Sequence, residues 1–334
     1  MPEGPDALAP DARTPPAVSF CIVATAKREL LLRCLDAVAG EAEGLGPSSE
    51  VLVLDNGSGD GSADAARAHP AGPTVIAHRA RRSKPENANE LMQRARGDYC
   101  LLLDEDAELE PGAARALYDA LENDPRAAGA GAALRAPDGK AQPSAWRFPS
   151  VPVALAGALF LHRRLTVQSG GSAAREVDWV QSAAMLVRRG AAEQIGWQDP
   201  AFFVYSDEVD FCRRLRDAGW RILHVPGARA VHHEQLSAER IPTARIVEFA
   251  RNRDRYMRKH HSPAAAAAVR WLTAWAYALR ALAALAIPGH RPGRYWAHVR
   301  ATLRPERGEG IREAAERHNR ALEVGGRPAG LRDA

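Results

Sequence analysis

Three consecutive carboxylates follow an apolar run in the first third of the chain. Residues 101–103 are all leucine and lead directly into Asp104, Glu105 and Asp106. Adjacent acids repel one another, and a cation bound between them would offset that repulsion. Carboxylate oxygens are the ligands that Mg²⁺ and Mn²⁺ prefer, often together with phosphate oxygens of a substrate. The segment is therefore a candidate metal site, and a solvated acidic loop is the simpler alternative.

A second acidic group and a histidine pair could also do chemistry. Asp207, Glu208 and Asp210 stand in the first turn of an expected helix, where the helix dipole favours carboxylates on structural grounds alone. His232 and His233 end an expected strand, either as a hydrogen-bonded pair or as metal ligands.

Asp55 begins a turn-rich segment that resembles a nucleotide loop only superficially. Glycines occur at 57, 59 and 61, but they follow the second expected strand and lack the GxGxxG spacing. We therefore exclude a Rossmann cofactor site. An Asx turn is the simplest role for Asp55.

The elements that position these residues alternate between strand and helix. Apolar runs predict strands at 18–25, 50–55, 74–77 and 99–103, and helical patterns lie at 30–38, 62–68 (with Ser62 as its cap) and 86–96. This alternation predicts an α/β domain with a parallel sheet covered on both faces. Ligands bind at the carboxyl ends of such strands, where Thr25, Asp55 and Asp104 lie.

The second half of the expected domain is less regular. We expect irregular structure over 137–175, another apolar run over 177–188, a helix over 206–218 closed by Gly219, and two short strands at 221–225 and 229–233. The Gly after the helix is typical of a helix C-terminus.

Composition places the chain among folded globular proteins. Of its 334 residues, 46% are hydrophobic and 26% are charged, which excludes collagen-like, coiled-coil and wholly disordered chains. The four cysteines lie too far apart for a CxxC motif, so we expect reduced thiols and a cytoplasmic protein. Residues 1–17 have neither the basic nor the apolar region of a secretory signal, and we expect a disordered leader.

The charge is distributed unevenly. Residues 238–334 hold 19 Lys and Arg against 9 Asp and Glu, a balance of +10, which leaves −6 for residues 1–237. The apolar stretch 264–287 contains Arg270 and Arg280, which makes it a poor transmembrane span. Its Trp271 and Trp275 beside arginine suit a helix lying on anionic lipid. The alternatives are a helix packed on the preceding domain and a nucleic-acid-binding arm, but no nucleic-acid-binding motif is present and we expect no such partner.

Taken together, the order of these motifs resembles the family 2 glycosyltransferases, and among them the bacterial rhamnosyltransferase-type branch. The resemblance covers about residues 18–260 and rests on the segments ending at Asp55, 101–106, 179–183, 202–211 and 231–233. It implies a GT-A fold, which is an α/β domain with a mostly parallel sheet and flanking helices. It also implies a nucleotide-diphosphate-sugar donor, a divalent metal (Mg²⁺ or Mn²⁺) and inversion at the anomeric carbon.

The resemblance assigns roles to individual residues. Residues 104–106 match the DxD motif, with Asp104 toward the ribose and Asp106 toward the metal, and His232 matches a late metal-ligating histidine. Thr25 matches a position lining the nucleotide pocket, and Asp55 matches the acid that binds the pyrimidine ring.

Further positions match less closely. The family's glycine-rich segment before the third helix is replaced here by 83–89, where Asn89 matches, and Trp179 and Ser182 fall in a loop that contacts the donor. Glu208 takes the position of the catalytic base, with Asp207 as its competitor because the acidic pair is in reversed order.

The resemblance implies an enzyme that transfers sugar to a saccharide or lipid-linked saccharide in cell-surface polysaccharide synthesis. We expect a cytoplasmic protein, whose basic tail could hold it peripherally at the inner face of the cytoplasmic membrane. The expected organisation is a leader (1–17), a GT-A domain (18–237) and a basic helical region (238–334). Two alternatives remain. A nucleotidyltransferase normally carries a glycine-rich loop after its first strand, whereas residues 24–29 contain no glycine. A non-catalytic sugar-nucleotide- or membrane-binding protein would not need both acidic groups.

Overall fold

The computed structural model describes residues 17–45, 49–233 and 242–324. Residues 1–16 of the expected leader, and the expected boundary at 237–238, lie outside these ranges.

The N-terminal half of the sheet follows the predicted alternation. Its parallel strands lie in the order β3-β2-β1-β4, and they are β1 (Val18–Ala24), β2 (Ser49–Asn56), β3 (Thr74–His78) and β4 (Tyr99–Asp104). The helices between them are α1 (Arg28–Gly44), α2 (Ser62–Arg67) and α3 (Lys84–Arg94). Ser62 is the first residue of α2 and not its cap, because Gly61 holds the cap position in a left-handed conformation that glycine adopts easily.

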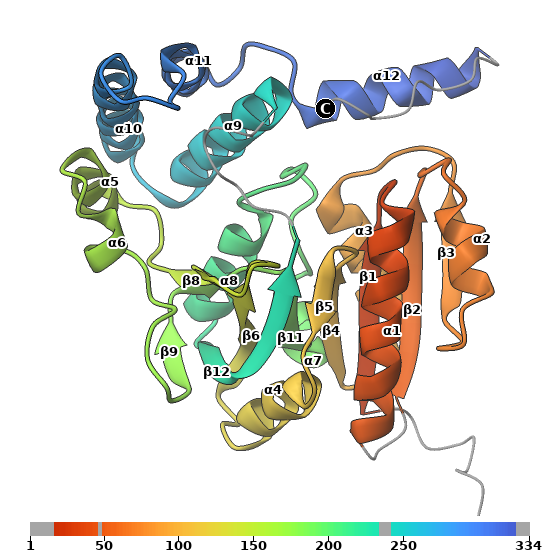
Figure 1. Cartoon of the computed structure of the whole chain (residues 1–334). Coiled ribbons are helices and arrows are strands. Elements are labelled where there is room, and N and C mark those ends of the chain that lie inside the picture. The colour runs from red at the N-terminus through yellow and green to blue at the C-terminus, as the bar shows by residue number, and fades with distance from the viewer. Residues whose placement is uncertain (1–16, 46–48, 234–241, 325–334) are drawn as a thin grey trace, which may run out of the picture.

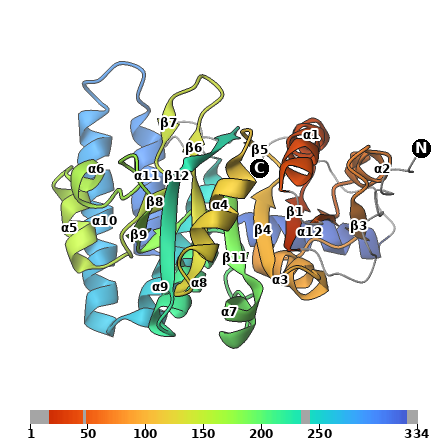
Figure 2. The ribbon, with the colours of Figure 1, turned by 90° about the horizontal axis from the view of Figure 1, so that it is seen from below.

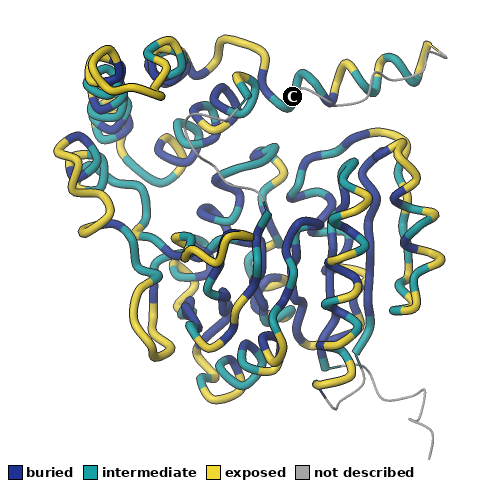
Figure 3. Tube along the Cα trace, in the orientation of Figure 1, coloured by how far each residue is buried: buried dark blue, intermediate teal, exposed yellow. Residues whose placement is uncertain are grey.

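Both faces of the sheet are buried, as the continuous apolar runs predict. Phe20 and Ile22 of β1 pack with α1 on one face, while Cys21, between them, packs with Leu91 of α3 on the other. The central strands are accordingly buried along their length (Figure 3). Two hydrophobic cores therefore hold the carboxyl ends of β1 and β4 at one edge.

The sheet continues beyond β4 with strands of mixed direction. The full order is β3-β2-β1-β4-β11-β6-β12-β5, in which β11 (Ala184–Arg188) is antiparallel to both of its neighbours. The remaining strands of this path are β6 (Ala127–Arg135), β12 (Arg221–His232) and β5 (Ala107–Leu109). Helices α4 (Ala113–Glu122), α7 (Arg189–Gln194) and α8 (Asp207–Asp217) flank them (Figures 1 and 2).

Three predictions for this half were wrong in detail. The two short strands expected at 221–225 and 229–233 form the single strand β12, whose register against β6 shifts between Val225 and Arg229. The apolar run at 177–188 is divided among the end of β9 (Arg175–Val177), β10 (Trp179–Val180) and β11. The segment expected to be irregular contains β7 (Ala141–Gln142), β8 (Ala145–Trp146), α5 (Val151–Ala158) and α6 (His162–Leu165).

Four helices complete the described chain: α9 (Thr243–His260), α10 (Pro263–Ala283), α11 (Pro292–Leu303) and α12 (Ile311–Glu323). Tyr256 and Met257 of α9 and Val269 of α10 share a core with Phe202 and Val209, so α9 and α10 pack on the region around α8. Figure 1 shows α9, α10 and α11 above one half of the sheet and α12 over the other. Within the described segments, no helix combines the length and apolarity needed to cross a bilayer.

Candidate active site

A cavity of about 620 Å³ lies where the carboxyl ends of β1 and β4 meet the later helices. Its walls come from the loop after β1, the start of α3, the 104–106 turn, the loop before α8, and α9. The acids singled out from the sequence therefore face a common space, as expected for the strand ends of an α/β sheet.

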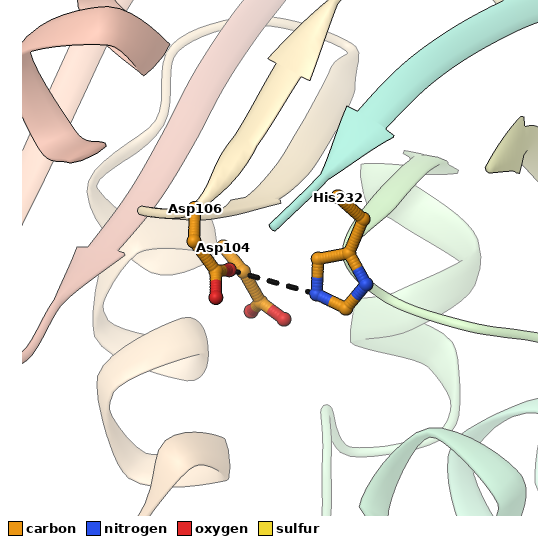
Figure 4. A group of neighbouring side chains, drawn as sticks. All are labelled: Asp104, Asp106 and His232. Atoms are coloured by element: carbon orange, nitrogen blue, oxygen red, sulfur yellow. Dashed lines mark ion pairs between the residues drawn. The ribbon is translucent and has the colours of Figure 1, made fainter. Parts of the chain in front are cut away.

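Asp104, Asp106 and His232 form a cluster at one side of this cavity (Figure 4). One ligating atom from each lies within 4.8 Å of the others. The cluster depends on sheet register, because β12 pairs antiparallel with β5 and sets His232 opposite Ala107. His233, the next residue of the chain, instead binds Glu108 at 2.6 Å between Nε2 and Oε1.

Two lysines neutralise the cluster. Lys27 Nζ lies 2.8 Å from Asp106 Oδ2, and Lys84 Nζ lies 2.5 Å from Asp104 Oδ1. Burial alone would raise the pKa of Asp106, yet its hydrogen bonds with His232 and Lys27 hold that pKa well below its usual range. Two aspartate side chains and one imidazole are an oxygen and nitrogen donor set that suits a divalent cation.

Glu105, between the two aspartates, belongs to the scaffold. Its Oε2 accepts a hydrogen bond from the backbone N–H of Thr25 at 2.8 Å, which joins the ends of β1 and β4. Burial raises the pKa of Glu105 to about 8. The middle acid of the three therefore fixes the loop that carries Thr25.

The acidic pair at the start of α8 faces the same cavity. Tyr205 and Ser206, just before it, have φ angles of 67° and 60°, a left-handed conformation that costs on the order of 1–3 kcal/mol per non-glycine residue. Asp207 is 1% exposed, and neither of its carboxylate oxygens has a hydrogen-bond partner in the described structure. Burial and the neighbouring Asp207 carboxylate raise the pKa of Glu208 well above its ordinary value.

Asp210, the third acid of this run, has a structural role. It is fully buried and binds His260 Nε2 at 2.7 Å, Lys259 Nζ at 2.7 Å and Arg214 Nε at 2.8 Å. These contacts bring the C-terminal end of α9 onto α8. Burial would raise the pKa of Asp210, but its hydrogen bonds from these partners lower it to about 2.

Most of the predicted site residues line the cavity: Thr25, Asp104, Asp106, Trp179, Asp207, Glu208 and His232. The ring of Trp179 stacks on Trp146 with centroids 4.5 Å apart, which gives this wall a flat aromatic surface. Both indoles come from short paired strands, β8 and β10.

Asp55, Asn89 and Ser182 do not line the cavity. The Asp55 carboxylate accepts a hydrogen bond from Ser58, whose hydroxyl in turn accepts one from the backbone of Ala26. The side-chain amide of Asn89 exchanges two hydrogen bonds of 2.9 Å with the backbone of Gln198. Ser182 is buried in a small void beside Asp104.

The structure also adds residues that the sequence did not single out. Lys27, Asn56 and Arg82 line the cavity, and so does Asn87, which is fully buried and has no partner for either side-chain atom among the described residues. No sequence pattern distinguishes them. Asn87 is one of two asparagines in a short helix, and only the fold shows which of them faces inward.

The sequence also matches a family of known proteins. Residues 15–278 match the model of the family described as glycosyltransferase like family 2. The chain belongs to this family. As a family 2 glycosyltransferase, it is an enzyme, and the α/β architecture with a mostly parallel sheet is the predicted GT-A fold.

Individual relatives agree with this assignment. The glycosyltransferase is 30% identical over 249 residues to the N-acetylglucosaminyl-diphospho-decaprenol L-rhamnosyltransferase of Mycobacterium tuberculosis, over 69% of this chain and 81% of that protein. The predicted rhamnosyltransferase-like branch is thereby confirmed.

Solved structures agree in fold. The mannosyltransferase PcManGT of Pyrobaculum calidifontis, solved with GDP-Man and Mn²⁺, superposes with a TM-score of 0.56 at 17% identity, over 91% of this chain and 89% of that one. GalNAc-T7, solved with UDP, GalNAc and Mn²⁺, gives 0.55 at 12% identity, over 93% of this chain and 58% of that one.

Proposed function

We propose that this glycosyltransferase transfers a sugar, with inversion, from a nucleotide-diphosphate donor to a lipid-linked saccharide acceptor. The observation that carries the proposal is the shared cavity, which holds the Asp104, Asp106 and His232 cluster together with the acidic pair of α8. The Mycobacterium tuberculosis relative is named for a diphospho-decaprenol acceptor and for rhamnose. We therefore propose rhamnose or a similar hexose as the sugar and a polyprenyl-diphosphate saccharide as the acceptor, in cell-surface polysaccharide synthesis.

Glu208 is the proposed general base. Its raised pKa makes the ionised form a stronger base than an exposed glutamate. As the acceptor hydroxyl oxygen bonds to the anomeric carbon, its proton passes to Glu208. The bond from that carbon to the diphosphate oxygen breaks with its electron pair, and the nucleoside diphosphate leaves. A single displacement inverts the configuration and needs no covalent nucleophile.

Asp207 has a different proposed role. It is buried, its two oxygens have no partner among the described residues, and Asn87 is in the same situation on the cavity wall. Buried polar atoms without partners are rare and point to a ligand that supplies them. We propose that Asp207 and Asn87 form hydrogen bonds with hydroxyl groups of a sugar. The proton transfer is then left to Glu208.

Asp104, Asp106 and His232 would hold the divalent cation, Mg²⁺ or Mn²⁺. Such a cation, when bound, offsets the negative charge that the leaving diphosphate gains. Lys27 and Lys84 already face the same carboxylates and would add positive charge near the diphosphate. For donor binding we propose direct contacts from Thr25 and Trp179. Asp55, Asn89 and Ser182 would act through the backbone segments they hold.

We propose that the membrane contact predicted for the basic tail also includes an apolar surface formed by α5 and α6. Of the 13 large apolar side chains exposed in the described structure, 11 belong to α5 and α6 or to the stretch from α10 to α11. α5 packs against α10, where the Arg280 guanidinium lies 4.6 Å from the ring centroid of Phe160. We call this surface the apolar basic face (α5–α6 and α10–α11).

Its charge indicates an anionic bilayer as the partner. Residues 151–165 and 263–303, which form this face, contain no Asp or Glu but hold seven Arg. Basic residues near an anionic lipid surface contribute about 1 kcal/mol each, and exposed tryptophans favour the interface. Val153 of α5 lines the cavity while Leu155 and Leu159 are exposed, so the face adjoins the site where a lipid-linked acceptor would react. We place the enzyme at the cytoplasmic surface of the membrane.

A donor screen tests the reaction. The full chain is incubated with UDP-, GDP- and dTDP-linked sugars, with Mn²⁺, with Mg²⁺ or with a chelator, and released nucleoside diphosphate is measured. We expect one donor class to be consumed, and only with metal present. Release of pyrophosphate would instead indicate a nucleotidyltransferase, and binding without turnover, even with a polyprenyl-diphosphate saccharide added, would indicate a non-catalytic protein.

A further inference from the structure

Two asparagines from distant parts of the chain hold the loop that follows β3. Asn56, at the end of β2, donates from Nδ2 to the Arg82 carbonyl at 3.0 Å, and its Oδ1 accepts from the Arg82 N–H at 2.8 Å. Asn319 of α12 makes the same pair with Arg81, at 3.0 Å and 2.7 Å. Each asparagine side chain thus forms two hydrogen bonds with the backbone N–H and C=O of one residue, as a neighbouring β-strand would.

This loop forms part of the cavity wall, because Arg82 and Asn56 both line the cavity. It also packs closely on the loop after β2. Gly57 has a φ of +67°, and a Cβ at this position would lie 2.7 Å from the carbonyl oxygen of Arg79. The position of residues 79–82 is therefore set from one side by β2 and from the other by α12.

α12 holds a second wall of the same cavity. Arg312 Nη2 donates to the carbonyl of Ala201 at 2.8 Å, and its guanidinium lies 5.5 Å from the ring centroid of Phe203. Phe203 lines the cavity, and its carbonyl accepts from the backbone N–H of Lys84 at 2.8 Å. Ile311, the first residue of α12, itself lines the cavity.

The start of α12 is fixed by a buried carboxylate. Glu248 of α9 is fully buried and accepts hydrogen bonds from the Arg312 N–H at 3.2 Å and from Asn252 Nδ2 at 3.0 Å. A Cβ at Gly310 would clash with Glu248 Oε2, so a larger residue here would force the Glu248 carboxylate to shift. From this anchor α12 extends over the part of the sheet formed by β1, β2 and β3 (Figures 1 and 2).

We propose that α12 is a strap that completes the donor end of the cavity, and that Asn319 is a positioning residue for donor binding. The proposal rests on the proposed function in taking the ligand to be a nucleoside diphosphate or its sugar. α12 holds the 79–84 segment and the 201–203 loop in place before the ligand arrives, so binding does not have to order them. α12 lies outside the residues that match the family model.

Asn319→Ala removes the two hydrogen bonds between the Asn319 side chain and the Arg81 backbone. Two ordinary hydrogen bonds correspond to about a tenfold change in an equilibrium constant. We expect the Kd for UDP, GDP or dTDP, measured by calorimetry with Mn²⁺, to rise about tenfold for whichever nucleotide the wild type binds. The donor KM should rise similarly, with kcat nearly unchanged. Asn319→Asp keeps the acceptor for the Arg81 N–H and should give an intermediate loss.

Arg320→Ala is the matched control. Arg320 is the next residue of α12, and its side chain forms an exposed ion pair with Glu316 at 3.9 Å. This variant should bind nucleotide as the wild type does.

Hydrogen exchange gives a readout that needs no ligand: the backbone amides of residues 79–84 should exchange faster in Asn319→Ala and not in Arg320→Ala.

Unchanged exchange at 79–84 together with unchanged nucleotide affinity in Asn319→Ala would overturn the strap. Equal losses in Asn319→Ala and Arg320→Ala would also overturn it, because they would reflect a general weakening of α12. If the wild type binds none of the three nucleotides, the proposed function fails. The strap is then decided by the exchange comparison alone, in which faster exchange confined to Asn319→Ala supports it.

Discussion

His232 Nε2 lies 3.5 Å from Asp106 Oδ1, although the two residues are far apart in the sequence. The pairing of β12 with β5 creates this proximity, because it aligns His232 with Ala107, the neighbour of Asp106. Sheet register at this edge, and not local sequence, therefore decides which of the two adjacent histidines joins the acidic cluster.

The first prediction concerns metal binding at this cluster. Asp106→Asn should lower the affinity for Mn²⁺ and reduce turnover by orders of magnitude, since it removes a charged ligand. His232→Ala should weaken binding less, because it removes a neutral one. His233→Ala is the control, since His233 contacts Glu108. Calorimetry with Mn²⁺ and donor checks the order, and a larger effect of His233→Ala would contradict the assignment.

The second prediction identifies the base. A general base contributes about 10²–10⁴-fold, so Glu208→Gln should lose about that much in kcat, or roughly 3–5 kcal/mol. Asp207→Asn should mainly raise the KM of the donor or acceptor whose hydroxyl it binds. Steady-state kinetics of both variants decide between them. If Glu208→Gln retains normal kcat while Asp207→Asn is inactive, Asp207 is the base.

The third prediction is a pH profile. Burial and the Asp207 carboxylate raise the pKa of Glu208, and only its ionised form can accept a proton. The value of kcat/KM should therefore rise with pH through a midpoint well above the ordinary glutamate value of 4.5. Removing the neighbouring charge in Asp207→Asn should move that midpoint to lower pH. A midpoint at or below 4.5, or one that Asp207→Asn leaves in place, would contradict the role of Glu208.

The fourth prediction concerns the apolar basic face. Leu159→Glu and Trp271→Glu place a negative charge on side chains that are 59% and 65% exposed. Both should reduce co-sedimentation with vesicles of phosphatidylcholine and phosphatidylglycerol, while turnover of a soluble acceptor stays unchanged. Val324→Glu, at an exposed apolar residue outside the face, should bind vesicles normally. Wild-type binding that is equal on neutral and anionic vesicles would remove the electrostatic part of the proposal.

The fifth prediction concerns the buried ion cluster of Asp210. Asp210→Asn leaves Arg214 and His260 without their carboxylate, and breaking a buried pair costs about 3–5 kcal/mol of unfolding free energy. The folded pKa of about 2 lies below that of an unfolded aspartate, so this stabilisation is present above about pH 4 and is lost as the pH falls toward 2. Urea unfolding should show the wild-type advantage shrinking over that interval. A constant difference would mean that the charge is not responsible.

The elements predicted best are those whose signals are local. Strands β1 to β4 are continuous apolar runs, and their structural ends differ from the predicted ones by one residue or less. β12 was divided in the prediction because Pro226 and Gly227 interrupt it, whereas the sheet absorbs them as a shift in register. Helix α5 was missed because its residues are apolar on all sides and carry no helical periodicity.

The site residues also differ in whether their roles follow from local sequence or from the fold. Acids at strand ends could be located from sequence, because carboxyl ends of parallel strands share an edge. The partners of those acids could not be located from the sequence. Lys27, Asn87 and Asn319 acquire their roles from segments brought together only in the folded chain, as in the contact between Asn319 and Arg81. No spacing in the sequence relates those two residues.

The position of the proposed strap near residue 320 also affects when, during synthesis, the donor site can form. A ribosome makes the chain from its first residue, and folding can begin before synthesis ends. When residue 310 has emerged, the whole sheet, the acidic cluster and both histidines are already available, but Ile311, Arg312 and Asn319 are not. In our proposal, a nascent or prematurely terminated chain of this length carries the candidate catalytic residues and still binds donor poorly. In our proposal, competence for the nucleotide sugar is therefore acquired only once residues 311–319 have been made.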